Sequence, residues 1–169
     1  MEGSQDLELK FKSEAIADLW QEHCALHTQL FELTCDEYVH LLASDMEELD
    51  QVIEDKKALI GRINQLEDKR QLLVQELNNN HPNAKIEKMA GLILFLKSKN
   101  METDATRIEK LNLVLMDIID KIQNQNKKNQ LYLNKALVSL KELKESFGGP
   151  KKQYNTYGSN GAARNDLRR

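Results

Sequence analysis

The sequence predicts an all-α protein: an elongated antiparallel helical hairpin or bundle with a long carboxy-terminal helix and a disordered tail. Of its 169 residues, 30% are charged and only 5% are aromatic, and the chain contains just 7 glycines and 2 prolines. An all-β fold needs frequent turns, and a doubly wound α/β fold needs apolar strand runs that open onto glycine-rich turns. Neither pattern is present. High charge with few helix breakers is instead typical of long helices.

The first helix is predicted over residues 13–43. Seven residues recur there at alternating spacings of three and four, which places them on one helical face: Ile16, Leu19, His23, Leu26, Leu30, Leu33 and Glu37. The sequence Ser44-Asp45-Met46-Glu47 predicts a capping box, in which Ser44 caps the next helix and Glu47 reaches back to it. Because the link is so short, the two helices must form an antiparallel hairpin.

The second helix is predicted over residues 46–78. It continues the same alternation through Leu49, Val52, Lys56, Leu59, Ile63, Leu66, Arg70, Leu73 and Leu77. Lys56 and Arg70 interrupt this apolar series, and we expect their stems to be buried while their charged ends reach water. Three asparagines and Pro82 follow, which favour a turn and end the helix.

A shorter third helix is predicted over residues 84–98, although Gly91 within it costs about 1 kcal/mol relative to alanine. The periodicity breaks near Asn100, which either folds the chain back or only kinks it. A fourth helix is predicted over residues 103–147, where Gly148-Gly149-Pro150 stops it. We therefore expect a single helical domain over residues 1–149. Residues 150–169 are expected to form a flexible tail that is basic, with five lysines and arginines against one aspartate.

The fourth helix is the longest of the four. At 1.5 Å per residue it measures roughly 65 Å, against roughly 45–50 Å for each of the first two. Its last part, residues 131–147, therefore lacks enough surface of its own chain to cover it. An uncovered apolar stripe marks a binding surface, and it suits an amphipathic helix of a partner. The predicted apolar contacts are Leu133, Leu137, Leu140, Leu143 and Phe147. Homodimerisation through the same stripe is the alternative.

Asn126 and Asn129 replace aliphatic residues at successive positions of the same helical face. Two interpretations remain open. Buried polar residues in a helical seam can fix its register at a cost in stability. Alternatively, the seam is incomplete because a partner completes it, and the two amides bind that partner.

No group of residues predicts catalysis or a bound metal. His23 and His27 lie on one helical face, and Glu37 and His40 have the spacing of half a di-iron site, but the further ligands that such sites need are missing. Nucleophile elbows and glycine-rich phosphate loops are missing as well. We therefore predict no catalytic residue, no metal and no cofactor.

Charge and cysteine positions restrict the partners and the compartment. Outside its basic tail the chain is acidic, which argues against binding nucleic acid. Cys24 and Cys35 lie about 16 Å apart along one helix, beyond disulfide reach, which suits a reducing cytosol. The longest apolar run, residues 89–96, is too short to cross a bilayer, and the opening residues lack an apolar signal core. We expect a cytoplasmic protein that does not insert into membranes.

Two stretches of the sequence resemble the FlgN family of flagellar export chaperones. Near the amino terminus these are the turn Leu41-Leu42-Ala43-Ser44-Asp45 and the following Glu54-Asp55-Lys56-Lys57-Ala58-Leu59-Ile60. Near the carboxy terminus, Asn126, Asn129, Leu133, Leu137 and Leu140 precede a glycine-containing break. The segment Tyr154-Asn155-Thr156-Tyr157-Gly158-Ser159-Asn160-Gly161 is then similar to the tail of that family.

This resemblance implies a cytosolic chaperone of the flagellar type III secretion system. Its clients would be the two hook–filament junction proteins, whose carboxy-terminal amphipathic helices it would keep from associating prematurely. It would also deliver these clients, with Tyr157 contacting the export gate. The alternative is a structural coiled-coil homodimer or tethering protein without a client.

Overall fold

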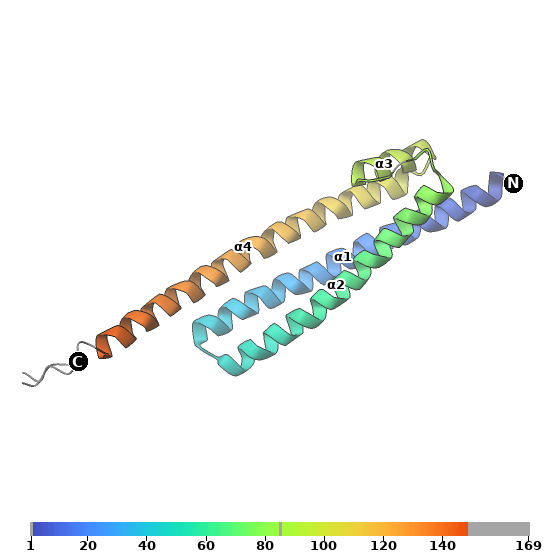
Figure 1. Cartoon of the computed structure of the whole chain (residues 1–169). Coiled ribbons are helices and arrows are strands. Elements are labelled where there is room, and N and C mark those ends of the chain that lie inside the picture. Colours follow the sequence, from blue (N-terminus) through green and yellow to red (C-terminus); the bar gives the residue numbers. More distant parts are fainter. Residues whose placement is uncertain (1, 85, 149–169) are drawn as a thin grey trace, which may run out of the picture. The chain divides into compact units, whose positions relative to one another are not determined.

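The computed structural model describes residues 2–84 and 86–148, with side chains from Leu7 onward. The described residues form four helices and no strand: α1 (Glu2–Ala43), α2 (Met46–Asn80), α3 (Met89–Ser98) and α4 (Glu102–Phe147) (Figure 1). The all-α prediction is confirmed. The predicted tail, with Tyr157, lies outside the described residues, so the domain boundary at residue 149 stays a prediction. The chain divides into one compact unit that ends at Leu131 and a second that begins at Tyr132.

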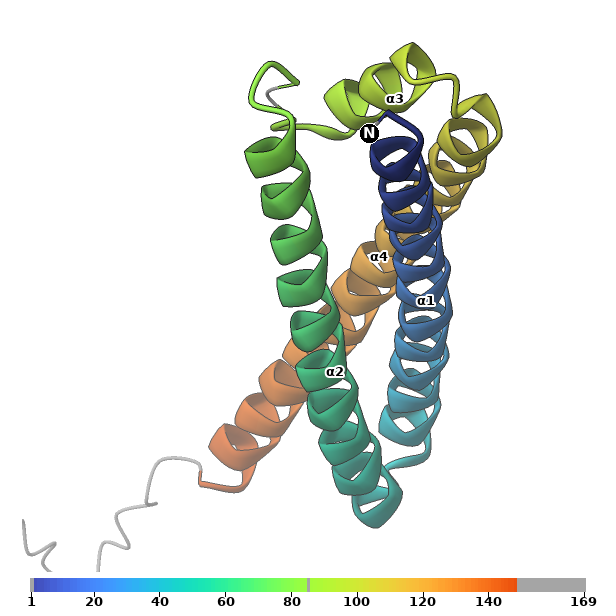
Figure 2. The ribbon, with the colours of Figure 1, turned by 90° about the vertical axis from the view of Figure 1, so that its right-hand side faces the viewer.

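The first unit is built on the antiparallel pair of α1 and α2, which lie side by side in Figures 1 and 2. The predicted seam forms, and four leucines from it make one buried cluster: Leu19, Leu26, Leu59 and Leu66. Two polar positions of the seam also meet, because the Lys56 ammonium pairs with the Glu37 carboxylate. Both of these side chains are largely buried, so Lys56 does not extend its charged end into water as the sequence predicted.

The hairpin turn is capped differently from the prediction. Ser44 has φ 56, which is left-handed backbone. The N–H groups of Ser44 and Asp45 donate to the carbonyls of Leu41 and His40, at 3.3 and 3.1 Å, a Schellman ending for α1. The side chain of Asp45 then caps α2 by accepting from the Glu48 N–H. The predicted capping box at Ser44 is wrong, because a residue that closes one helix in left-handed backbone cannot have the extended backbone of a cap for the next.

α1 begins eleven residues earlier than predicted, at Glu2. The reason is tertiary packing. Leu9 is 3% exposed and belongs to the larger buried cluster, together with Leu77 at the end of α2 and Leu92 of α3. The burial of Leu9 stabilises helical turns whose sequence has only a weak apolar period.

The side chain of Asn78 bonds across the loop between α2 and α3. Asn78 accepts from the N–H of Ile86 at 2.7 Å and donates to the carbonyl of Ile86 at 2.9 Å. α2 therefore continues through the asparagines to Asn80, and α3 begins at Met89 rather than at residue 84. α3 lies across the end of the hairpin that is remote from the turn (Figure 2). There it buries Leu92, Ile93, Phe95 and Leu96.

The break near Asn100 folds the chain back rather than kinking it. Asn100 has φ 60, and the N–H groups of Asn100 and Met101 donate to the carbonyls of Lys97 and Leu96 in a second Schellman ending. α4 then starts at Glu102, one residue before the predicted position, and its part within the first unit runs parallel to α1. Three polar contacts follow that path: Ser13 Oγ to Asp104, Arg107 to Asp18 and Trp20 Nε1 to Asn112.

The left-handed Ser44 predicts that Ser44→Gly stabilises the protein. Glycine has no Cβ to strain this conformation, so we expect the free energy of unfolding to rise by about 1 kcal/mol in urea denaturation followed by circular dichroism. Ser98→Gly is the matched control, since Ser98 lies in the last turn of α3 and glycine there is expected to lower the stability. A loss of stability in Ser44→Gly would contradict the assigned turn.

Candidate partner-binding site

The last part of α4 exposes a row of large apolar side chains. They follow one another at spacings of three or four residues, so they share one side of the helix. We call this row the carboxy-terminal stripe: Leu133, Leu137, Leu140, Leu143 and Phe147. Their exposed fractions run from 40% at Leu133 to 85% at Phe147. An apolar row this exposed is a feature of surfaces that bind other proteins.

Polar residues surround the stripe on the same helix. Lys141 lies beside it, Glu142 and Glu145 lie toward the opposite side of the helix, and every residue from Leu133 to Gly148 is exposed. Lys144 falls between Leu140 and Phe147 on the stripe itself by helical spacing. This end of α4 is therefore amphipathic, with a leucine side broken by one ammonium group. A complementary partner would present an apolar side with an acidic or carbonyl group opposite Lys144.

Asn129 is buried and bonded within the chain. Its side chain is 3% exposed, and its amide donates to the backbone carbonyl of Thr34 on α1 at 2.9 Å. Its oxygen accepts from Gln125 at 3.0 Å, while the Thr34 hydroxyl donates to Leu30 in its own helix. Asn129 thus attaches α4 to α1. The part of Thr34 is not evident from the sequence, because a threonine that bonds its own helix gives no pattern that points to a second helix.

Asn126 lies one helical turn earlier and is exposed. Its oxygen is 3.5 Å from the ammonium group of Lys56, the residue that pairs with Glu37. Asn126 and Asn129 both belong to the first compact unit, whereas the stripe belongs to the second. Asn126 and Asn129, which the sequence analysis treats as a pair, differ in burial: Asn126 is exposed and Asn129 is buried.

The cysteines and histidines show no sign of chemistry. Burial raises the pKa of the Cys24 and Cys35 thiols, and the Cys24 thiol donates to the Leu111 carbonyl at 3.3 Å. A raised pKa leaves less of the thiolate that acts as a nucleophile. In residues 2–84 and 86–148, no three His, Cys, Asp or Glu side chains come together as metal ligands would. His23 and His27 stack at 5.7 Å between ring centroids, without a third ligand in this part of the chain.

The burial of Asn129 predicts a stability effect that Asn126 does not share. Asn129→Ala leaves the Thr34 carbonyl without its amide donor, so we expect the free energy of unfolding to fall by roughly 1–3 kcal/mol. Asn126→Ala is the matched control, and we expect a change within about 0.5 kcal/mol because the residue is exposed. Urea denaturation measures both variants, and equal losses would contradict the geometry around Thr34.

Comparison with known proteins gives one finding. The sequence profile of the family described as FlgN protein matches residues 12–165, which is most of the chain. Searches of curated proteins and of solved structures found no match. In the described residues, no helix has an apolar stretch long enough to cross a bilayer. From the profile match, the chain therefore belongs to the FlgN family of flagellar export chaperones.

Proposed function

We propose that this chaperone binds the carboxy-terminal amphipathic helices of the flagellar hook–filament junction proteins. The observation that supports the proposal is the carboxy-terminal stripe, whose five apolar side chains are exposed at spacings that match a helical partner. A client helix bound along the stripe would bury the apolar side through which it otherwise associates with other client molecules. The client would then be kept from associating prematurely in the cytoplasm before export.

The affinity of this complex is limited by the ordering of the client. A disordered segment that folds on binding loses about 2–5 kcal/mol of the gross interaction energy in becoming ordered. Full burial of a leucine or phenylalanine contributes roughly 1.5–3 kcal/mol. Five such contacts exceed the ordering cost, so we expect binding that is favourable but weaker than the buried apolar surface alone would give.

The two asparagines have different parts in this proposal. Asn126 is exposed, and a hydrogen bond from it to the client would fix the register of the client helix along α4. Asn129 already donates to Thr34, so it contributes to client binding through the position of α4 unless it exchanges that bond for one to the client. The apolar contacts are assigned to the stripe alone.

A double substitution in the stripe tests client binding. Leu137→Asp with Leu140→Asp is expected to weaken binding of a junction protein's carboxy-terminal segment at least roughly 100-fold in isothermal titration calorimetry, because two leucines that the client would cover are replaced by charges. Leu131→Asp with Val138→Asp is the matched control, since both residues are exposed and lie away from the stripe around the helix. Circular dichroism should show equal helicity in both variants.

Two results would overturn this assignment. One is unchanged affinity in the stripe variant. The other is sedimentation equilibrium that shows a tight homodimer, persisting with excess client and lost in the stripe variant, because the stripe would then join two copies in a tethering protein.

Tyr157 is assigned to delivery. We propose that it contacts the export gate of the type III secretion system, on the grounds of the family's tail pattern. Tyr157→Ala is expected to abolish capture of the gate's cytoplasmic domain by the chaperone–client complex and to leave client affinity unchanged. Tyr154→Ala is the matched control, and equal gate capture by both variants would remove the assignment.

A further inference from the structure

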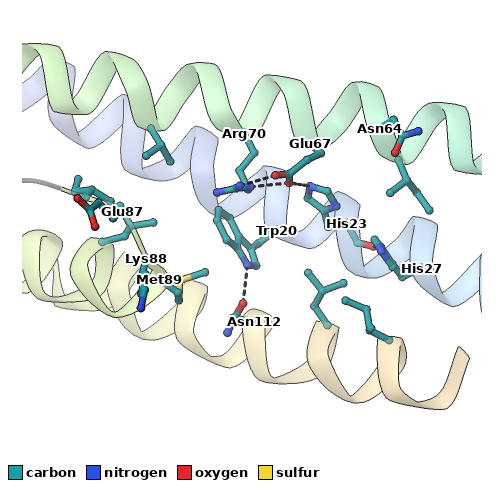
Figure 3. A pocket seen from close by; sticks show the side chains of 16 residues that line it. Trp20, His23, His27, Asn64, Glu67, Arg70, Glu87, Lys88, Met89 and Asn112 are labelled. Atoms are coloured by element: carbon teal, nitrogen blue, oxygen red, sulfur yellow. Dashed lines mark hydrogen bonds and ion pairs between the residues drawn. The ribbon is translucent and has the colours of Figure 1, made fainter. Parts of the chain in front are cut away.

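A cavity of about 420 Å³ lies within the first unit, between α1, α2, the first part of α4 and the segment that leads into α3 (Figure 3). Its volume is in the range of sites that hold small organic groups, roughly 300–1,000 Å³. One wall is aromatic and aliphatic, formed by Trp20, Leu115 and Ile119. The cavity shares no residue with the carboxy-terminal stripe.

His23 lines this cavity with an imidazole that makes no hydrogen bond to the described residues. The residue is 4% exposed, and neither ring nitrogen has a hydrogen-bond partner among the described residues. A Glu67 carboxylate oxygen lies 3.8 Å from Nε2, beyond hydrogen-bond reach. Buried polar groups in folded proteins are nearly always paired. The His23 imidazole at the cavity wall is therefore available to pair with a polar group of a molecule bound in the cavity.

The charges around His23 restrict that ligand. Glu67 accepts two hydrogen bonds from Arg70, which lower the pKa of its carboxyl and keep it ionised. The Arg70 guanidinium lies 5.8 Å from the centroid of the Trp20 ring system. A bound anion would meet the Glu67 carboxylate, and a bound cation would meet Arg70. A neutral group avoids both repulsions.

The hydrogen-bonding capacity of the His23 imidazole favours a ligand with a hydroxyl group. Burial, and then the neighbouring His27, lower the pKa of His23, so the ring is neutral at pH 7. A neutral imidazole has one donor and one acceptor nitrogen. A hydroxyl group can both donate and accept, so it can pair with His23 in either tautomer.

We propose that this cavity binds a phenol, with the aromatic ring packed against Trp20 and the hydroxyl paired with His23. The aromatic wall of Trp20, His23 and His27 favours a ring over an aliphatic chain. The phenol is either the side chain of a tyrosine in a partner protein or a free small molecule. This inference does not rest on the proposed client binding, because the two sites have no residue in common.

The tyrosine side-chain analogue p-cresol tests the site in the full-length protein. Trp20 is the sole tryptophan and lines the cavity, so its fluorescence, excited where phenols do not absorb, reports binding directly. We expect a saturable change with p-cresol. Toluene, which lacks the hydroxyl, gives the reference affinity. The absence of a saturable p-cresol response would overturn the proposal.

The role of His23 is tested by the ratio of the two affinities. The binding affinity for p-cresol divided by that for toluene is expected to fall roughly fivefold to tenfold in His23→Leu, the factor expected for one hydrogen bond. His40→Leu is the matched control, since His40 lies outside the cavity, and its ratio should equal that of the native chain. An unchanged ratio in His23→Leu would overturn the proposal.

A second measurement covers the case in which His23→Leu fails to fold. In the native protein, p-cresol should shift the imidazole nitrogen signals of His23 in nuclear magnetic resonance spectra, and toluene should leave them in place. Equal shifts with both compounds, or none with either, would overturn the pairing.

Competition distinguishes the two sources of the phenol. An amphipathic helical peptide with one tyrosine, compared with its phenylalanine counterpart, is added to the p-cresol complex. Displacement by the tyrosine peptide alone supports a protein partner, whereas displacement by neither peptide, with p-cresol still binding, supports a small molecule. Equal displacement by both peptides would contradict the role of the hydroxyl.

Discussion

The seam between α1 and α2 is the interaction on which the rest of the first unit depends. Its leucines form the buried cluster that holds the two helices together, and the Lys56–Glu37 pair lies in the same seam. Removing one partner of a largely buried ion pair is costly, so this pair penalises any shift of one helix along the other. Because the two helices are in register, Leu77 and Leu9 meet α3 in the second buried cluster, and α4 has a fixed place to begin.

α4 is attached to that hairpin by a different kind of contact. Along its length within the first unit, the buried apolar residues Ala105, Ile108 and Ile122 alternate with polar pairs such as Trp20–Asn112 and Thr34–Asn129. Such bonds are directional, so they fix the rotation of α4 more than they add to stability. They also leave room between the helices, and the cavity beside Trp20 lies where the apolar packing is incomplete.

The proposed function rests on where apolar surface is buried and where it is exposed. A chaperone must keep some apolar surface exposed to bind a client, yet fold stably by itself. This chain separates the two requirements. Its first unit buries the leucines of the α1–α2 seam, and its second carries the stripe in a helix whose described residues beyond Tyr132 are all exposed. Lys144 and the flanking charges keep that exposed helix from being uniformly apolar.

The helices, the antiparallel hairpin and the apolar positions of the stripe can be predicted from residue spacing, because a period of 3.6 residues is a local property of the chain. The other features depend on contacts that form only when the chain folds. Leu9 extends α1 because α2 and α3 bury it, and Asn78 delays α3 by bonding Ile86. Asn129 proved to be bonded to Thr34, a residue 95 positions away, and the unpaired nitrogens of His23 became visible only with their surroundings. Such contacts join residues far apart in the chain, so no local pattern encodes them.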